Sequence, residues 1–273
     1  MSAHAPVAAF FDLDKTIIAT SSAFAFGKEF FKGGMITRQE AWEISLSKAQ
    51  YMLVGQSSEK MDTTRDTLAQ MVAGWEVEDI QRITRETLRE VVAPAIYAEA
   101  RELIAAHKNA GHHVIIISAS AKILVEPIAQ ELGVDTVVAT EMAVKDGRLT
   151  GDVTRYLKGG AKAEAVRQFA AEHHFDLDAS YAYSDSATDI PMLELVGHPV
   201  AVNPDRALKK HALANGWQAR TFKNPEPLIQ MPHAREVGVG AGVIAGVTAL
   251  AVAGVFIARA VGGKGSDEKR HSA

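Results

Sequence analysis

Pairs of aspartates follow two short apolar runs in this sequence and are its clearest candidates for chemistry. Asp12 and Asp14 come after the apolar residues 7–11, and Asp185 comes shortly after residues 181–183. Carboxylates crowded into one place repel one another, so either one is protonated or a cation neutralises them. Mg2+ prefers oxygen ligands and usually takes one or two carboxylates together with water and substrate phosphate. The aspartates therefore predict a Mg2+ site that handles a phosphate group, with Asp12 and Asp185 as carboxylate ligands.

A serine and a lysine complete the set of groups that phosphoryl transfer requires. Ser118 follows the β-branched run 114–117. Its hydroxyl and the backbone N–H of Ala119 are suited to hold phosphate oxygens at the start of a helix. Lys162 can offset the excess negative charge of the site. Lys158 is a competing candidate for that place, because it lies in the same stretch of the chain.

These groups support a reaction in two steps. Asp12 can attack phosphorus to give an aspartyl-phosphate, and Asp14 can protonate the leaving oxygen and then activate water. Taken one at a time, the aspartates, including Asp189, also fit turn or cap positions. Ser118 alone also fits a helix N-cap, and Lys162 alone a solvated helix lysine. Their common position at strand ends, in this order, favours the functional interpretation.

The elements that must position these residues alternate between strand and helix. Strands are expected at residues 7–11, 114–117, 136–143, 148–153, 181–183 and 199–202, and helices at 95–110, 121–132, 161–174, 190–196 and 206–215. The alternation predicts an α/β fold, a Rossmann-like, doubly wound parallel sheet with helices on both faces. Ligands bind at the carboxyl ends of strands in such sheets, where Asp12, Ser118 and Asp185 each stand.

Residues 20–92 are expected to form a helical bundle that is inserted after the first strand as a cap. Apolar residues recur there at helical spacing, and no stretch alternates in the manner of a strand. Trp42 and Trp75 lie on apolar faces and are assigned to the core of the bundle. The core of the larger domain then comprises residues 1–19 and 93–222.

Composition excludes several classes of function. The chain has 273 residues and no cysteine, so disulfides, thiolate catalysis and Cys-ligated zinc are all excluded. A net charge of -4 provides no bulk positive field for nucleic acid. The histidine pairs at 112–113 and 173–174 lack the spacing of zinc ligands and are assigned to the surface.

The C-terminal part of the chain differs in character. Residues 237–258 contain no charged side chain, and as a helix they would span about 33 Å, enough to cross a hydrocarbon core of about 30 Å. The run predicts a transmembrane helix at 237–259, between a proline-containing linker at 223–236 and a polar tail at 260–273. The alternative is a buried Gly/Ala-rich helix of a core.

Small residues within this run also suggest self-association. Gly238, Gly242 and Gly246 recur every four residues, a pattern that allows close helix–helix approach and hence a homodimer. Because the N-terminus lacks the features of a signal peptide, the catalytic domain is expected in the cytoplasm, anchored to the membrane from its C-terminal side.

The segment Asp12-Leu13-Asp14-Lys15-Thr16 resembles the DxDx[TV] signature of haloacid dehalogenase-like hydrolases. The later segments resemble the other motifs of that family in order, at Ser118, at Lys162, and at Asp185 with Asp189. The resemblance covers residues 7–222. The helical insertion resembles a C1-type cap, and the whole is similar to the phosphoserine phosphatase branch of the family.

The resemblance implies a role for each acidic residue. Asp12 would be the nucleophile and Asp14 the general acid and base. Mg2+ would be held by Asp12, the backbone carbonyl of Asp14, and Asp185. Asp189 and Thr16 would be neighbouring supports.

The resemblance also assigns the phosphate ligands and marks two departures. Ser118 and Ala119 would bind the substrate phosphate, and Lys162 would stabilise the phospho-enzyme. Ser21 stands where phosphoserine phosphatases usually have a glutamate that helps to recognise the amino-acid head group. The fourth motif reads Ser-Asp-Ser-Ala-Thr-Asp, where that branch usually has Gly-Asp-Gly-Ala-Asn-Asp.

The sequence therefore predicts a Mg2+-dependent phosphomonoester hydrolase that acts on a small phosphorylated metabolite, with phosphoserine among the candidates. Two alternatives stay open. One is a catalytically silent, membrane-tethered binding or scaffold protein. The other is a phosphotransferase that passes the phosphoryl group from the same aspartyl-phosphate to an alcohol.

Overall fold

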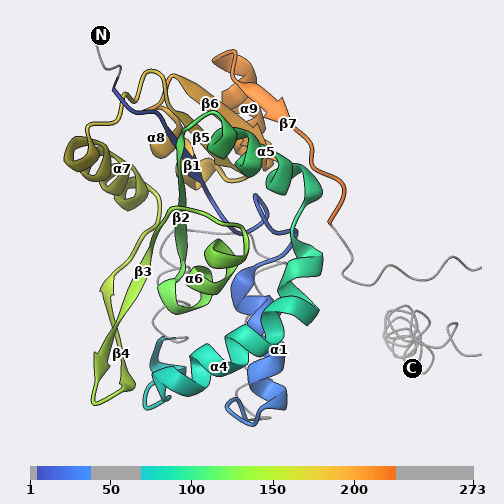
Figure 1. Ribbon diagram of the computed structural model, residues 1–273, viewed down its shortest axis with the longest axis vertical. Helices are drawn as coiled ribbons and strands as arrows, with labels where there is room; N and C mark the ends of the chain where they lie inside the picture. The colour runs from blue at the N-terminus through green and yellow to red at the C-terminus, as the bar shows by residue number, and fades with distance from the viewer. Residues whose placement is uncertain (1–4, 38–68, 226–273) are drawn as a thin grey trace, which may run out of the picture. The chain divides into compact units, whose positions relative to one another are not determined.

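A computed structural model of the chain describes residues 5–37 and 69–225 (Figure 1). In that part of the chain seven strands form one sheet in the order β4-β3-β2-β1-β5-β6-β7. Neighbouring strands are parallel except β3 and β4, which form an antiparallel hairpin. The strands are β1 (Ala8–Phe11), β2 (His113–Ala121), β3 (Thr136–Lys145), β4 (Arg148–Arg155), β5 (Tyr181–Ser184), β6 (His198–Val202) and β7 (Gln218–Arg220). The predicted α/β fold with a mostly parallel sheet is confirmed.

Strand β1 lies at the centre of the sheet, with every residue apolar and buried. Ala9 and Phe11 pack into a core that includes buried residues of α5 and α6. Ala8 and Phe10 face the opposite core, which includes buried residues of α7, α8 and α9. The helices are α5 (Ala98–Asn109), α6 (Lys122–Glu131), α7 (Gly160–His173), α8 (Ile190–Leu193) and α9 (Arg206–Ala214). Helices therefore cover both faces, which is why a wholly apolar strand can form the centre.

The hairpin between β3 and β4 turns at the position that the sequence predicts. Asp146 and Gly147 both have positive φ, 52° and 76°. A tight turn with two left-handed residues twists in the sense that an antiparallel hairpin needs, and aspartate followed by glycine tolerates that conformation best.

Three elements differ from the prediction. Strand β2 ends at Ala121 and not at residue 117, so Ser118 lies within the strand and not after it. Helix α8 ends at Leu193 and is shorter than the expected helix at 190–196. The chain must turn at once to bring Gly197 against the backbone of Asp178, where a Cβ atom would lie 1.8 Å from the Asp178 carbonyl oxygen. Strand β7 was not predicted, because its three residues are all exposed and show no apolar pattern.

The segment expected to form a helical cap is described at its two ends. Helix α1 (Ser22–Lys32) lies at the first end, and helix α4 (Val77–Thr87) lies at the second. A π-helical turn at Leu88–Val92 and a 3-10 turn at Ala93–Ala95 follow α4. Phe30 and Ile83 are buried in the same core cluster, and Trp75 packs edge-on against Phe30 with ring centroids 5.4 Å apart. Trp42 and the helical repeats predicted within 38–68 lie outside the described residues, so the complete cap stays a prediction.

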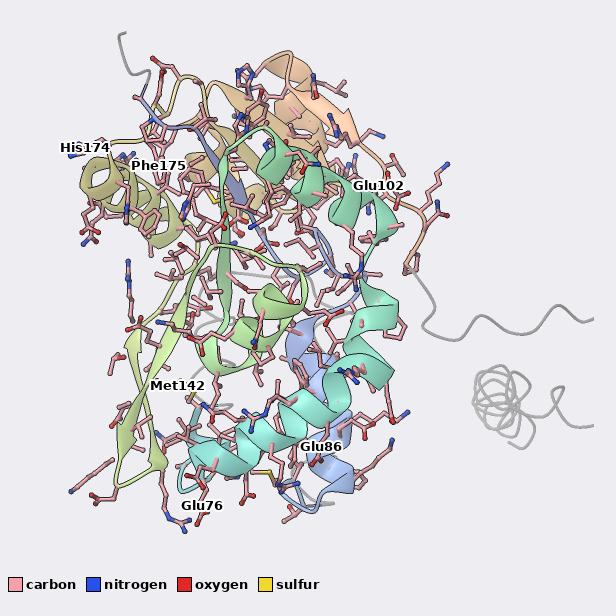
Figure 2. The ribbon with its side chains drawn as sticks, in the orientation of Figure 1. Glu76, Glu86, Glu102, Met142, His174 and Phe175 are labelled. Carbon is pink, nitrogen blue, oxygen red and sulfur yellow. The ribbon has the colours of Figure 1, made fainter. Side chains whose placement is uncertain are left out.

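The tip of the β3–β4 hairpin is joined to the segment that leads into α4. The N–H of Gly74 donates to the Leu149 carbonyl at 2.7 Å, and the Leu149 N–H donates to the Trp75 carbonyl at 3.0 Å. The N–H of Val77 donates to the Gly147 carbonyl at 2.9 Å. The Glu76 carboxylate, labelled in Figure 2, also pairs with the Arg148 guanidinium.

The predicted transmembrane helix at 237–259, its three spaced glycines and the polar tail all lie outside the described residues. Among the residues that are described, no helix is long and apolar enough to cross a membrane. The first residues of the predicted linker pack against α5, where the Lys223 N–H donates to Glu99 at 2.9 Å.

Candidate active site

Three neighbouring strands bring the predicted site residues to one edge of the sheet. Asp12 directly follows β1, and Asp185 directly follows β5, the parallel neighbour of β1. The Asp12 N–H donates to the Tyr183 carbonyl at 2.9 Å, so the ladder between the two strands continues past the end of β1. Ser118 lies within β2, which pairs with β1 on its other side. The sheet thus brings Asp12, Ser118 and Asp185 to the edge at which ligands bind in parallel sheets.

The nucleophile candidate Asp12 contacts two predicted partners. The Lys162 ammonium donates to one carboxylate oxygen of Asp12 at 2.6 Å, and the Thr16 hydroxyl donates to the other at 3.2 Å. The same ammonium donates to Asp189 at 2.7 Å. The exposed fractions of Asp12, Lys162 and Asp189 are 7%, 3% and 2%, so this ion-paired group is shielded from water. Geometry selects Lys162 over Lys158 for this place.

The start of α7 places Lys162. Gly159 precedes the helix with φ 55° and ψ -121°, a conformation open to glycine and strained for other residues. A Cβ atom at position 159 would lie 3.5 Å from the Thr188 carbonyl oxygen, which shows how closely this turn approaches the loop after β5. Lys158, one residue earlier, has a buried ammonium without a hydrogen-bond partner in the described part of the chain.

The loop after β5 places Asp189, with help from a serine that the sequence argument missed. The Ser184 hydroxyl donates to the same Asp189 oxygen that Lys162 contacts, at 2.8 Å. Ser186 caps the 3-10 turn Ala187–Asp189 by accepting from the Thr188 N–H at 3.3 Å. Ser184 is the last residue of strand β5 and directly precedes Asp185. That position could have indicated from the sequence that its hydroxyl lies at the site.

Burial dominates the electrostatics of this group. It raises the pKa of the Asp12 carboxyl to about 6; the Lys162 ammonium opposes this shift, and Asp189 adds to it. Burial also raises the pKa of the Asp185 carboxyl to about 7, with Asp12 as the next contributor. Burial alone would lower the pKa of Lys162, but Asp12 and Asp189 outweigh it and raise that pKa above its ordinary value. The site therefore holds more carboxylate charge than its lysine neutralises.

This surplus fits a divalent cation with oxygen ligands. The Asp185 carboxylate accepts no hydrogen bond and joins no ion pair within the described residues, although it is half-buried near Asp12. No group of three acidic or histidine side chains in residues 5–37 and 69–225 is arranged to hold a metal. Mg2+ needs only one or two carboxylates when backbone, water and phosphate oxygens supply the rest. The predicted set of Asp12, Asp185 and the Asp14 carbonyl has the oxygen donors that such a site requires.

The Asp14 carboxylate is held by serines. It accepts from the Ser22 N–H at 2.8 Å, from the Ser120 hydroxyl at 3.0 Å and from the Ser21 hydroxyl at 3.3 Å. Lys15, between Asp14 and Thr16, has a left-handed backbone conformation with φ 63°. Sequence reasoning had assigned no role to Ser22 or Ser120, because a contact across 106 positions leaves no local pattern.

The remaining predicted residues are placed as follows. Ser118 is buried, and its hydroxyl accepts from the Ser120 N–H at 3.1 Å; it makes no hydrogen bond to Asp12 or Asp185 in the described structure. Ala119 is partly buried beside it. His174, predicted to be at the surface, is exposed at the outer end of α7 (Figure 2).

The sequence is similar to known proteins of one family. A model of the haloacid dehalogenase-like hydrolase family matches residues 9–194. A Mycobacterium tuberculosis protein named as a probable phosphatase is 46% identical over 258 residues, covering 93% of this chain and 89% of that protein. A phosphoserine phosphatase of the same organism is 34% identical over 242 residues, covering 87% and 79%.

A solved structure shares the fold. A phosphoserine phosphatase carrying an analogue of its phospho-aspartyl intermediate superimposes with a TM-score of 0.59 at 22% identity, covering 81% of this chain and 95% of that chain. At this identity the likeness concerns the fold alone.

Proposed function

The chain belongs to the haloacid dehalogenase-like hydrolases and is a phosphatase, and from this premise we propose that it hydrolyses a small phosphomonoester through a phosphoryl group carried on Asp12. The observation that carries the proposal is the setting of Asp12. Its carboxylate stands at the end of the central strand, fixed by Lys162 at 2.6 Å and Thr16 at 3.2 Å. A fixed carboxylate has little freedom to lose on approaching phosphorus.

In the first half of the reaction, an Asp12 oxygen forms a bond to phosphorus while the bond from phosphorus to the ester oxygen breaks. Asp14 gives its proton to that departing oxygen, which leaves as an alcohol. In the second half, Asp14 takes a proton from water, and the water oxygen attacks phosphorus. Inorganic phosphate leaves, the Asp12 carboxylate is restored, and Asp14 holds a proton again.

The supporting residues keep the reacting groups in place. Lys162 holds Asp12 and balances the charge that accumulates on the phosphoryl oxygens, while Asp189 and Ser184 hold Lys162 from behind. The Ser118 hydroxyl and the N–H of Ala119 are proposed to bind phosphate oxygens. Mg2+, held by Asp12, Asp185 and the Asp14 carbonyl, would reduce the repulsion between an anionic nucleophile and an anionic phosphate.

Phosphoserine is the first substrate to test. Support comes from the relative at 34% identity that is named as a phosphoserine phosphatase. Ser21, which stands where phosphoserine phosphatases usually have a glutamate, has its hydroxyl oxygen 3.3 Å from Asp14, so the test must include esters with other head groups. A panel of phosphorylated metabolites that includes phosphoserine, with phosphate release as the readout, would identify the preferred ester.

Trapping the intermediate tests the proposal. Enzyme turning over p-nitrophenyl phosphate is quenched in acid and reduced with borohydride, which converts an aspartyl-phosphate to homoserine. Peptide mass spectrometry is expected to find homoserine at position 12. Asp12→Asn should lose both the trapped product and turnover to the detection limit while keeping its circular dichroism spectrum, whereas Asp178→Asn, an exposed change, should retain both. Turnover in Asp12→Asn, or trapping at another aspartate, would contradict the assignment.

Two further proposals rest on the sequence. Residues 237–259 are proposed to anchor the chain in a membrane and to associate through the glycines at 238, 242 and 246; resistance to carbonate extraction and crosslinking in detergent test the two points. Transfer of the phosphoryl group to an alcohol acceptor would use the same aspartyl-phosphate. Analysis of products formed with added glycerol separates transfer from hydrolysis.

A further inference from the structure

A second hydrogen-bonded chain of side chains lies at the site and ends on the Asp14 carboxylate. The Ser22 hydroxyl donates to the Ser120 hydroxyl oxygen at 2.7 Å, and the Ser120 hydroxyl donates to an Asp14 carboxylate oxygen at 3.0 Å. The two serines come from different parts of the chain. Ser22 begins α1, and Ser120 lies near the end of β2.

We propose that Ser120, supported by Ser22, is a positioning residue that holds Asp14 in the orientation from which it transfers a proton to the leaving oxygen. The inference rests on the proposed function and names a residue that the two-step reaction does not itself require. It concerns how the general acid is aimed, while Ser120 forms no bond to the reacting atoms.

The direction of the chain follows from burial and chemistry. The Ser22 side chain is 0% exposed, so its hydroxyl must find a protein acceptor, and the Ser120 oxygen is the one within reach. The Ser120 oxygen accepts the Ser22 hydrogen, and its own hydrogen is directed to Asp14, so the chain runs from Ser22 through Ser120 to the carboxylate. Linked donors of this kind polarise one another and strengthen the final bond.

Backbone hydrogen bonds fix the main chain at both serines. The Ser120 N–H donates to the Ser118 hydroxyl oxygen at 3.1 Å, and the Ser22 N–H donates to the other Asp14 oxygen at 2.8 Å. Asp14 therefore has each carboxylate oxygen tied to a different element. The Ser21 contact at 3.3 Å is longer and adds less to the orientation.

The effect of Ser120→Ala on esters with different leaving groups separates a role in orienting Asp14 from a role in the stability of the site. The p-nitrophenolate ion leaves readily without a proton, whereas glycerol leaves only when its oxygen is protonated. The ratio kcat/KM covers the steps up to phosphoryl transfer, where Asp14 acts as acid. Ser120→Ala is therefore expected to lower kcat/KM for β-glycerophosphate about tenfold, part of the roughly 10²- to 10⁴-fold that a positioned proton donor contributes, and to leave p-nitrophenyl phosphate within about threefold.

Three further variants complete the test. Ser120→Thr keeps the hydroxyl and should restore the β-glycerophosphate rate. Ser22→Ala keeps the backbone bond to Asp14 and should show a smaller, selective loss. Ser180→Ala removes an equally buried hydroxyl, bonded to Ala8 and Asp176 at the opposite end of β5, and should change both substrates alike.

The outcomes distinguish the inference from the function on which it rests. If wild-type enzyme hydrolyses both esters and folded Ser120→Ala slows both equally or neither, the positioning role is wrong and the phosphatase stands. If wild-type enzyme hydrolyses neither ester, or Asp12→Asn stays active, the proposed function itself is wrong. A selective loss in Ser120→Ala with recovery in Ser120→Thr supports the role, and thermal denaturation confirms that each variant is folded.

Discussion

The Lys162 ammonium lies 2.7 Å from an Asp189 oxygen, in a setting where both side chains are almost wholly buried. Asp189 is 27 residues from Lys162 in sequence and takes no part in bond making. Its carboxylate, which Ser184 also contacts, holds the ammonium in line with Asp12. One cation therefore serves two buried carboxylates, and the stability of the fold and the aim of the nucleophile depend on the same side chain.

Removal of that cation should destabilise the protein. Lys162→Met leaves Asp12 and Asp189 buried without their shared partner, and breaking a buried pair in this way costs about 3–5 kcal/mol. Urea unfolding at pH 8 without Mg2+ measures the change. Lys209→Met, at an exposed position on α9, serves as the control and should stay within about 0.5 kcal/mol of wild type. A loss below about 1 kcal/mol in Lys162→Met would show that the pair is not buried as described.

Mg2+ should stabilise the folded protein through Asp185. A ligand at 100 times its dissociation constant stabilises the state that binds it by about 2.7 kcal/mol, and removal with EDTA should reverse the gain and abolish turnover. Thermal denaturation with and without MgCl2 provides the measurement. Asp185→Asn should lose the Mg2+-dependent shift, whereas Asp178→Asn, an exposed carboxylate outside the site, should keep it. An undiminished shift in Asp185→Asn would remove that residue from the metal set.

A buried histidine behind the site predicts acid sensitivity. Burial lowers the pKa of His107 from 6.5 to about 4, with His112 and Arg220 as smaller contributors. Between these values the unfolded chain binds the proton and the folded protein does not, so stability falls as pH falls from 6.5 to 4, by about 3 kcal/mol in total. The imidazole also contacts the Tyr183 hydroxyl at 2.7 Å and packs edge-on against Tyr181.

Comparison with a variant that does not titrate isolates this contribution. His107→Gln keeps a hydrogen-bonding side chain, and its stability should fall less steeply over the same pH interval. Urea unfolding at several pH values gives both curves, and the carboxylates contribute equally to each. Parallel curves for the two proteins would show that His107 titrates normally in the folded state.

Two glycines should respond in opposite ways to alanine. At Gly197 a Cβ atom would lie 1.8 Å from the Asp178 carbonyl oxygen, so Gly197→Ala must displace backbone and should cost on the order of 1–3 kcal/mol. Gly27 lies inside α1, and apart from its chain neighbours and the helix backbone no atom of residues 5–37 or 69–225 lies within 4 Å of the added atom. Gly27→Ala should therefore stabilise by about 0.5–1 kcal/mol through higher helix propensity. Thermal denaturation measures the stability of both variants. If both were as stable as wild type, the close packing at Gly197 would be contradicted.

The sequence predicted the parts of the site that stand at the ends of apolar runs. Asp12 and Asp185 each follow a short buried strand, and the rule that ligands bind at the carboxyl ends of parallel strands was enough to bring them together. Lys162 needed more, because a lysine in the first turn of a helix is ordinarily solvated. Its contact with Asp12 depends on how α7 packs against the sheet, which only the structure shows.

Other features left no readable pattern. The bond from Ser120 to Asp14 depends on the register between β1 and β2, and the bond from Ser184 to Asp189 depends on the path of a short 3-10 turn. Strand β7 carries only exposed residues, so neither alternation nor hydrophobicity marks it. Serine is also common in turns, which hides a hydroxyl that orients a carboxylate.

The backbone pairing between residues 74–77 and the hairpin tip gives the molecule a mechanical linkage. Any displacement of α4 relative to the sheet must either carry the tips of β3 and β4 along or break three main-chain hydrogen bonds together. Because the connection runs through peptide groups, trimming Glu76 or Arg148 would leave it intact. A shift of the sheet edge that carries β3 and β4 would therefore be passed to the start of α4 through the main chain.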